Sequence, residues 1–389
     1  MEFRLEKVSL LSCSSYDDSN LKDKILQSLT NIDFDPQLFQ GLRIGIKPNL
    51  LIPSDPERSI ITHPVFFQNM VQLINEYKGI PVLVENPAVH SLNTALKQTP
   101  YGDIIQALNI DVPDMTPTQL IPFDDAKQFK RIEISKAFFD VDMIINLPKL
   151  KTHGLTVLTG ALKNLFGVIP GLKKSRMHLK APSRDDFSNF MMDLYGGLLY
   201  GFDPPKPIIH VMDGIIGMEG EGPGLSGTSV PIGVIISSRD PLAVDWTASQ
   251  VINVPWEDIP TLKAGFQRSY CISSPDEIDI IGDDLDKVCL SSFKVSKNSI
   301  FSNAVRWPFT SSFFKQLLVE KPVPQAEKCT LCYQCMRICP AKAIQPAEQQ
   351  EKIPNYDYNK CIRCFCCMEI CPEAAIKTQR GWLQWLLRY

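Results

Sequence analysis

Cysteine is concentrated in one short stretch of this 389-residue sequence. Nine of the 12 cysteines lie between Cys329 and Cys371, in two copies of the pattern C-x2-C-x2-C-x3-C-P that start 32 positions apart. Two-residue gaps let three thiolates converge on an iron–sulfur cube from a single tight loop, whereas the fourth cysteine begins a helical turn and points away. The pattern therefore predicts two [4Fe-4S] clusters as cofactors.

In paired motifs of this kind the fourth cysteine of each copy binds the other cluster. One predicted quartet is Cys329, Cys332, Cys335 and Cys371, and the other is Cys361, Cys364, Cys367 and Cys339. Two zinc sites are the alternative, but zinc-binding loops usually present their cysteines in pairs with a longer gap between them. The stretch from about 321 to 380 resembles bacterial two-cluster ferredoxins, which implies one-electron transfer. Cys366 is an additional cysteine, and we expect its side chain to point away from the cluster.

A group of cations lies in the larger, N-terminal part of the chain. Lys149, Lys151, His153 and Lys163 fall within 15 positions after a predicted strand, and Lys47 follows another strand. Ligands of parallel α/β sheets bind beyond the carboxyl ends of the strands, and clustered cations there suit an anionic substrate. Crowded lysines lower one another's pKa, which favours a base or a nucleophile. Solvated surface lysines and a structural histidine are the alternative.

We accordingly predict Lys151, His153 and Lys163 as catalytic residues. The predicted substrate-binding residues are Lys47, Asn49, Lys149, Asn164, Gly220, Gly222 and Gly224. The three glycines form a loop that would allow close backbone approach to a carboxylate or phosphate, although a plain flexible turn would have the same composition. Asp240 is expected to cap the helix that starts at residue 241, and Asp213 could instead bind a metal or pair with a lysine.

Alternating strands and helices must position these side chains. Strands are expected at 8–12, 43–47, 81–85, 130–135, 143–147, 208–212, 232–237 and 277–281, and helices at 21–29, 63–77 with Thr62 as N-cap, 101–108, 155–166, 187–199 and 241–252. This alternation predicts an α/β domain with a mostly parallel sheet flanked by helices, followed by a small α+β two-cluster ferredoxin-like domain. The expected boundaries are 1–290 for the α/β domain, 291–324 for an aromatic-rich connector and 325–389 for the cluster domain with an apolar tail.

Six motifs of the α/β domain carry a family resemblance. They are GIKPNL (45–50), THP (62–64), NLPKLKTHG (146–154), GALKNLFG (160–167), DGIIGMEGEGPG (213–224) and SRDPLAVD (238–245). Over about residues 5–285 the sequence resembles the domain-of-unknown-function 362 family of iron–sulfur proteins, which implies no established reaction. A shorter stretch, from Gly160 through Lys163 to Gly171, is similar to the lysine loop of nickel-pincer lactate racemases and implies that Lys163 could contact a cofactor.

The composition narrows the possible functions. With a net charge of −3 and no nucleic-acid motif, the chain is not expected to bind nucleic acid. A charged N-terminus and the lack of 18 consecutive apolar residues predict a cytoplasmic protein without a spanning segment, although the apolar tail at 381–389 could touch a membrane surface weakly. Three functions stay open: a redox enzyme with a small anionic substrate and a redox partner protein, a non-catalytic electron carrier or scaffold docking a partner oxidoreductase, or a non-redox enzyme with structural clusters.

Overall fold

The computed structural model describes residues 5–171, 173–295 and 320–379. A nine-stranded sheet forms the centre of the larger domain, in the order β11-β1-β10-β9-β6-β2-β3 with β7 and β8 attached beside β9. The strands are β1 (Glu6–Ser12), β2 (Arg43–Pro48), β3 (Ile80–Leu83), β6 (Met143–Leu147), β7 (Lys149–His153), β8 (Val157–Thr159), β9 (Ile208–Gly220), β10 (Gly227–Ser238) and β11 (Ile278–Gly282). Five of the eight strand pairings are parallel, which confirms the predicted fold class.

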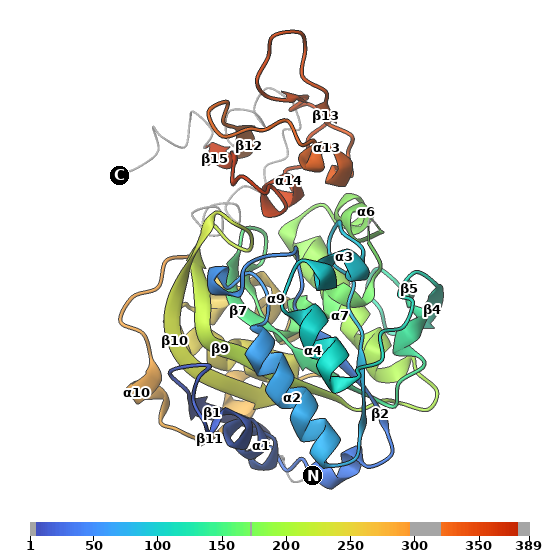
Figure 1. The fold of residues 1–389 in the computed structure, drawn as a ribbon, viewed down its shortest axis with the longest axis vertical. Helices are drawn as coiled ribbons and strands as arrows, with labels where there is room; N and C mark the ends of the chain where they lie inside the picture. Colours follow the sequence, from blue (N-terminus) through green and yellow to red (C-terminus); the bar gives the residue numbers. More distant parts are fainter. Residues whose placement is uncertain (1–4, 172, 296–319, 380–389) are drawn as a thin grey trace.

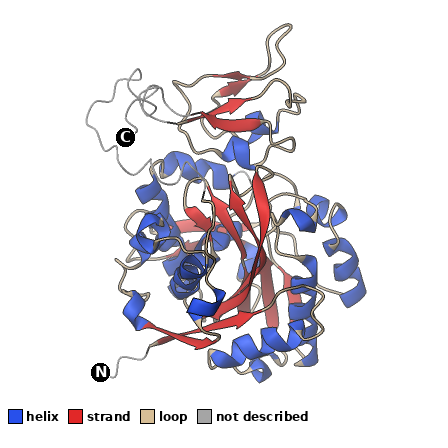
Figure 2. Cartoon of the chain, turned by 90° about the vertical axis from the view of Figure 1, so that its left-hand side faces the viewer, coloured by secondary structure: helices blue, strands red, loops and turns tan. Residues whose placement is uncertain are grey.

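Helices cover both sides of this sheet (Figure 2). They are α1 (Leu21–Asn31), α2 (Pro64–Glu76), α3 (Leu92–Lys97), α4 (Tyr101–Leu108), α5 (Ala161–Asn164), α6 (Lys173–Lys180), α7 (Arg184–Tyr200), α8 (Pro241–Val251), α9 (Pro260–Gly265) and α10 (Leu285–Val288). A separate hairpin consists of β4 (Thr118–Pro122) and β5 (Arg131–Ser135). Because both faces are covered, strand β6 is buried along its whole length and β2 along all but its first residue.

The order of the strands places the site. Strand β2 lies between β3, the next strand of this sheet along the chain, and β6, and all three run parallel. After β2 the chain continues to β3 on one side of β2, and it later forms β6 on the other side. Where connections diverge in this way, a crevice forms beyond the carboxyl ends of the two strands, here β2 and β6. Lys47 and Asn49 are at the end of β2, Asn146 is near the end of β6, and Glu85 follows β3.

The expected helix at 155–166 is wrong. Its first half is strand β8, which pairs with β7, and the helix α5 begins only at Ala161. The carboxylate of Asp245 explains this start, because it accepts hydrogen bonds from the backbone N–H groups of Ala161 and Leu162. The segment after β6, for which no element was expected, is strand β7.

Two further expectations need correction. The cap of α2 is His63, whose Nδ1 accepts from the N–H of Val65; the Thr62 hydroxyl instead accepts from the N–H of Asn49 and donates to the carbonyl of Leu147. The strands expected at 208–212 and 232–237 are much longer, because β9 and β10 continue as an antiparallel hairpin to Gly220 and Gly227. The cap predicted at Asp240 is confirmed by its hydrogen bond from the N–H of Leu242, at 2.7 Å.

A small module follows the α/β domain. It contains β12 (Lys321–Pro324) paired with β15 (Ile376–Gln379), β13 (Ile344–Gln345) paired with β14 (Asn355–Tyr356), and the short helices α13 (Gln334–Ile338) and α14 (Cys366–Glu369). The module lies at one end of the α/β domain, and α14 faces the tip of the β9–β10 hairpin (Figure 1). Strand β12 lies in the range expected for the connector. The aromatic residues of that connector and the apolar tail lie outside the described residues. Within the described ranges, no helix is long and apolar enough to span a bilayer.

Candidate active site and cluster cavities

The eight motif cysteines line two separate cavities in the small module. One cavity is lined by Cys329, Cys332, Cys335 and Cys371, and the other by Cys339, Cys361, Cys364 and Cys367. Each cavity holds about 360 or 340 Å³ of unfilled space, part of it open to solvent. In each case three thiols come from one loop and the fourth from the other repeat. A set of four thiols around a cavity of this kind fits a cubane cluster.

The duplication also appears in the backbone. Leu331 and Tyr333 in the first loop have positive φ angles, and so do their counterparts Arg363 and Phe365 in the second loop. Non-glycine residues adopt this left-handed conformation only where the surroundings enforce it. In both repeats the fourth cysteine then accepts a backbone N–H···S bond of 3.3 Å from the residue four positions later. Such bonds to cluster sulfurs tune the reduction potential.

Cys366 lies between two spaces. This residue, 5% exposed, lines the second cluster cavity and also a larger pocket between the module and the α/β domain. Cys366 separates the two spaces as a common wall residue.

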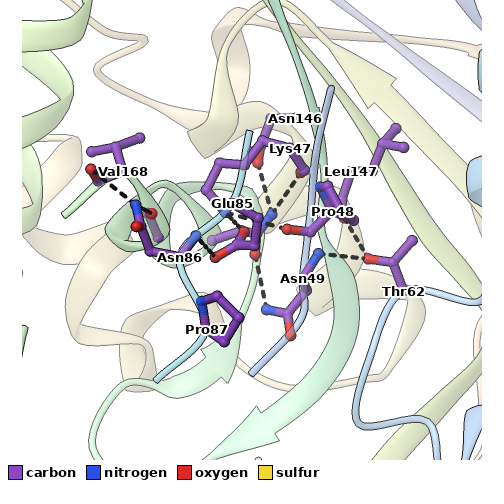
Figure 3. Close-up of polar contacts among 12 residues, drawn as sticks. Lys47, Pro48, Asn49, Thr62, Glu85, Asn86, Pro87, Asn146, Leu147 and Val168 are labelled. Carbon is purple, nitrogen blue, oxygen red and sulfur yellow. Dashed lines mark hydrogen bonds and ion pairs between the residues drawn. The ribbon is translucent and has the colours of Figure 1, made fainter. Parts of the chain in front are cut away.

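Asparagine and glutamate side chains organise the crevice beyond β2 and β6 (Figure 3). The Lys47 ammonium is fully buried and forms an ion pair with Glu85. Asn49 Nδ2 donates to Asn164 Oδ1 at 2.8 Å, and Asn164 Nδ2 donates to Asn146 Oδ1 at 2.8 Å. An added Cβ at Gly167 would lie 2.5 Å from both Glu85 Oε1 and Lys47 Nζ, so only glycine leaves room for the ion pair there.

This network forms one side of the pocket at the seam between the two domains. The pocket holds about 700 Å³ of unfilled space, part of it open to solvent. Its cations are Lys151, Lys163 and Lys174, all from the α/β domain. Glu85 and Glu369 also line it, and the remaining charged side chain of the β2 end, Lys47, is already paired with Glu85.

The three pocket lysines differ in their partners. Lys151 Nζ donates to Asn49 Oδ1 at 2.9 Å and to the carbonyl of Ile60, and Lys174 Nζ donates to the carbonyls of Asn86 and Pro87. Burial lowers the pKa of each to about 7, and the charge of Lys163 contributes in both cases. Neither pairs with a carboxylate in the described part of the chain.

Among the three pocket lysines, the ammonium group of Lys163 has the fewest hydrogen-bond partners in the described residues. Its Nζ lies over the rings of Phe166 and Phe187, at 4.8 and 5.5 Å from the ring centroids. Within the described ranges it makes no hydrogen bond or ion pair to a protein oxygen. Burial lowers its pKa from the ordinary lysine value, and Glu369 partly offsets this effect. A half-buried cation with aromatic neighbours is suited to receive an anionic ligand.

His153 connects the two domains. Its Nδ1 accepts from the N–H of Leu155 at 3.0 Å, and its Nε2 lies 3.3 Å from Glu369 Oε1. Burial, together with the charge of Lys163, holds the pKa of His153 well below its usual range. Both ring nitrogens therefore have partners, and the Nε2 contact joins the α/β domain to Glu369 of the small module.

Lys149 was predicted to bind substrate, but the structure places it elsewhere. Its Nζ forms an ion pair with Asp213 at 2.8 Å and a hydrogen bond to the hydroxyl of Tyr16, and all three side chains are buried. The same carboxylate accepts from Tyr16 and from the N–H of His63. Lys149 therefore neutralises a buried aspartate behind the pocket, and Asp213 is engaged by this lysine.

Replacing Lys149 with methionine should destabilise the fold and leave the pocket lysines in place. Removing one partner of a buried ion pair leaves an uncompensated charge, so we expect the free energy of unfolding to fall by about 3 kcal/mol or more. Denaturant titration of the anaerobic protein measures this. Lys263→Met, on the exposed side of α9, is the matched control. A loss no larger than that of the control would contradict the role given to Lys149.

The glycine loop, which was predicted to bind substrate, lies at the contact between the two domains. Pro223 lines the pocket, whereas Gly222 N donates to the hydroxyl of Thr152 at 3.2 Å and Gly220 N donates to the carbonyl of Lys294. A Cβ on Gly224 would lie 2.4 Å from the backbone oxygen of Glu369. The tip of the β9–β10 hairpin therefore serves as the docking surface for α14.

The sequence interpretation missed several residues of the pocket. They are Glu85, Asn86, Lys174, His178, Cys366 in its role as wall residue, and Glu369. Glu369 left a signal, because its counterpart in the first repeat is Arg337, which is exposed. A charge reversal within a well-matched repeat indicates a separate role. No pattern in the sequence indicated Lys174, since its approach to the pocket depends on the packing of α6.

The fold and these cavities define an α/β domain joined to a dicluster iron–sulfur module. Two family models match the chain: the domain of unknown function DUF362 over residues 44–250, and a 4Fe-4S dicluster domain over residues 321–372. The chain belongs to the DUF362 family, and it carries two [4Fe-4S] clusters through its dicluster domain. It is 29% identical over 262 residues to the thylakoid-associated protein sll1697 of Synechocystis sp., covering 67% of this chain and 78% of that relative.

Two solved structures show a distant similarity. The lactate racemase apoprotein from Thermoanaerobacterium thermosaccharolyticum has a TM-score of 0.37 at 12% identity, covering 65% of this chain. A protein from Thermotoga maritima has a TM-score of 0.31 at 11% identity, covering 56% of this chain. The present chain spans 59% and 55% of their respective lengths.

Proposed function

We propose that this protein is an iron–sulfur redox enzyme that binds a small anionic substrate at the seam between its two domains. One observation carries the proposal: Lys151, Lys163 and Lys174 line the same pocket as Cys366, and Cys366 also lines the second cluster cavity. A substrate in the pocket would thus be separated from that cavity by a single residue. When bound, the clusters supply one-electron transfer.

The residues of the chain divide the remaining tasks. Lys163 holds the anionic group, because its ammonium lacks another partner in the described structure. Lys151, whose pKa of about 7 lies close to neutral pH, can hold or release a proton at the pocket. His153 acts as a positioning residue for Glu369. Asn49 positions Lys151, and Asn164 positions Asn49 in turn.

A redox partner protein would meet the module at the first cluster cavity. Cys332 in that cavity is exposed, and its wall shares no residue with the substrate pocket. The substrate pocket and the partner surface would therefore be served by different cavities. Cytoplasmic location stays a prediction; the name of the Synechocystis relative raises thylakoid association as the alternative to test by fractionation.

Binding of an anion should weaken as the pH rises through about 7. Lys151 and Lys174 are charged below their lowered pKa values and neutral above them. For each of these lysines that must be charged for binding, the affinity for the anion should fall about tenfold per pH unit above its pKa. Calorimetry with butanoate between about pH 6 and 9 measures the profile. His178 has a pKa of about 3 and adds no inflection near 6.5. An affinity that is constant across this range would contradict a role for these lysines.

The docking of the module tests the proposed function. In Gly224→Val the side chain must displace the backbone of Glu369, so we expect the module to separate from the pocket while both clusters remain. The reduced protein is challenged anaerobically with a panel of small carboxylates and phosphate esters, and cluster oxidation is followed by visible absorbance. The wild type should react with at least one compound, and Gly224→Val at least tenfold more slowly. The proposal of a redox enzyme would be contradicted if no compound of the panel reacts with the wild type, or if Gly224→Val reacts as fast as the wild type.

A further inference from the structure

The two walls of the seam pocket differ in charge. The cluster module contributes only Ile338, Cys366, Glu369 and Ile370 to the lining. These are two aliphatic side chains, a thiol and a carboxylate, so every lining lysine lies on the opposite, α/β wall. Ile338 and Ile370 are 4% and 5% exposed, and both pack with the core of the α/β domain.

This asymmetry restricts how an anion can lie. An anionic group is attracted to Lys163 and the other lysines of the α/β wall. At the module wall the same group would meet aliphatic carbon and Glu369. Burial raises the pKa of this carboxyl group, and the charges of Lys163 and Lys151 partly offset the effect; its ionised form repels an anion and its protonated form offers no opposite charge. An uncharged hydrocarbon segment gains binding free energy where it covers apolar protein surface and removes it from water. Ile338 and Ile370 provide such surface at the module wall. Leu50, Leu51, Ala88 and Phe166 add apolar surface on the α/β side.

We infer that the pocket selects organic monoanions and binds them in one orientation, with the anionic group toward Lys163 and the uncharged body toward Ile338 and Ile370. The inference rests on the proposed function and deepens it by naming the substrate class. The uncharged end would then lie beside Cys366, next to the cluster cavity. Inorganic oxyanions lack the apolar body, and dicarboxylates would place their second charge against Glu369, a repulsive element of the kind that gives specificity.

A homologous series of carboxylates tests this orientation. Affinities of the anaerobic holoprotein for acetate, butanoate, hexanoate and octanoate are measured by calorimetry at constant pH. We expect the affinity to rise by about threefold to fourfold per added methylene until the pocket is full. Hexanoate should bind at least about tenfold more tightly than hexanedioate, because the second carboxylate of the latter stays hydrated or faces Glu369.

The two isoleucines should control the chain-length dependence. Ile338→Ala and Ile370→Ala are expected to reduce the gain per methylene to about twofold, because each removes apolar surface from the module wall. Ile344→Ala is the matched control, since Ile344 is buried in the same module and lines the second cluster cavity but not the seam pocket. Iron content and visible absorbance check that the clusters are intact, and Ile370→Val, with a smaller effect in the same direction, replaces any variant that loses them.

The outcomes separate this inference from the proposed function. A flat series, equal affinity for hexanoate and hexanedioate, or isoleucine variants that behave as the control would each overturn the orientation. Electron exchange with an inorganic oxyanion alongside a flat series would overturn the orientation and leave the redox function standing. A steep series that depends on Ile338 and Ile370, in a protein that exchanges no electrons with any carboxylate, would support the binding mode and remove the redox function.

Discussion

Replacing Cys339 with alanine will remove the cluster of the second cysteine loop, although Cys339 belongs to the first. The reason is the crossing of the two motifs, which brings Cys339 to the cavity lined by Cys361, Cys364 and Cys367. A cubane that has lost a thiolate ligand and gained access to solvent is labile. The iron content of the anaerobic protein should fall from about eight to about four per chain.

Double variants make this prediction decisive. Cys339→Ala combined with Cys361→Ala should leave about four irons, no fewer than either single variant, because both residues serve one cluster. Cys339→Ala combined with Cys335→Ala should leave almost none, because those residues line different cavities. Cys289→Ala, at an exposed site of the α/β domain, is the control and should keep all of its iron. The crossing would be disproved by a Cys339/Cys335 variant that retains about four irons.

Replacing Lys163 with methionine will abolish most of the anion affinity of the pocket. Methionine keeps the length and the contact with Phe166 and Phe187 but removes the charge. A charge-assisted contact in a partly desolvated site is worth about 2 kcal/mol or more, so the affinity for butanoate should fall about thirtyfold or more. Calorimetry on the holoprotein measures this loss.

Two comparisons guard this result against a loss of folding. Lys263→Met carries the same substitution on the surface of α9 and should bind butanoate like the wild type. Lys163→Arg keeps the charge and should recover a large part of the affinity. If Lys163→Met binds as tightly as Lys263→Met, the anion site lies elsewhere, and the roles given to Lys151 and Lys174 would have to be tested separately.

Much of the fold followed from local patterns. Strand β6 is mostly apolar, and helices α7 and α8 each begin after a polar capping residue, Ser183 and Asp240. The pattern failed at 155–166, where the apolar spacing suits a helix but β8 pairs with β7 and Asp245 fixes the start of α5 from 84 residues away. Local spacing carries no information about such a distant carboxylate.

The cluster chemistry follows from the amino-acid sequence alone, because the ligands of each iron–sulfur site are specified by short gaps that recur in two copies of one motif. The sequence also indicated that lysines would gather beyond the strand ends. Which of them face the same pocket depends on the packing of distant segments. Lys149 pairs with Asp213, whereas Lys174 reaches the pocket from α6 and Glu369 reaches it from the other domain. These contacts join segments between 64 and 216 residues apart, and such neighbours are set by how whole layers pack rather than by spacing along the chain.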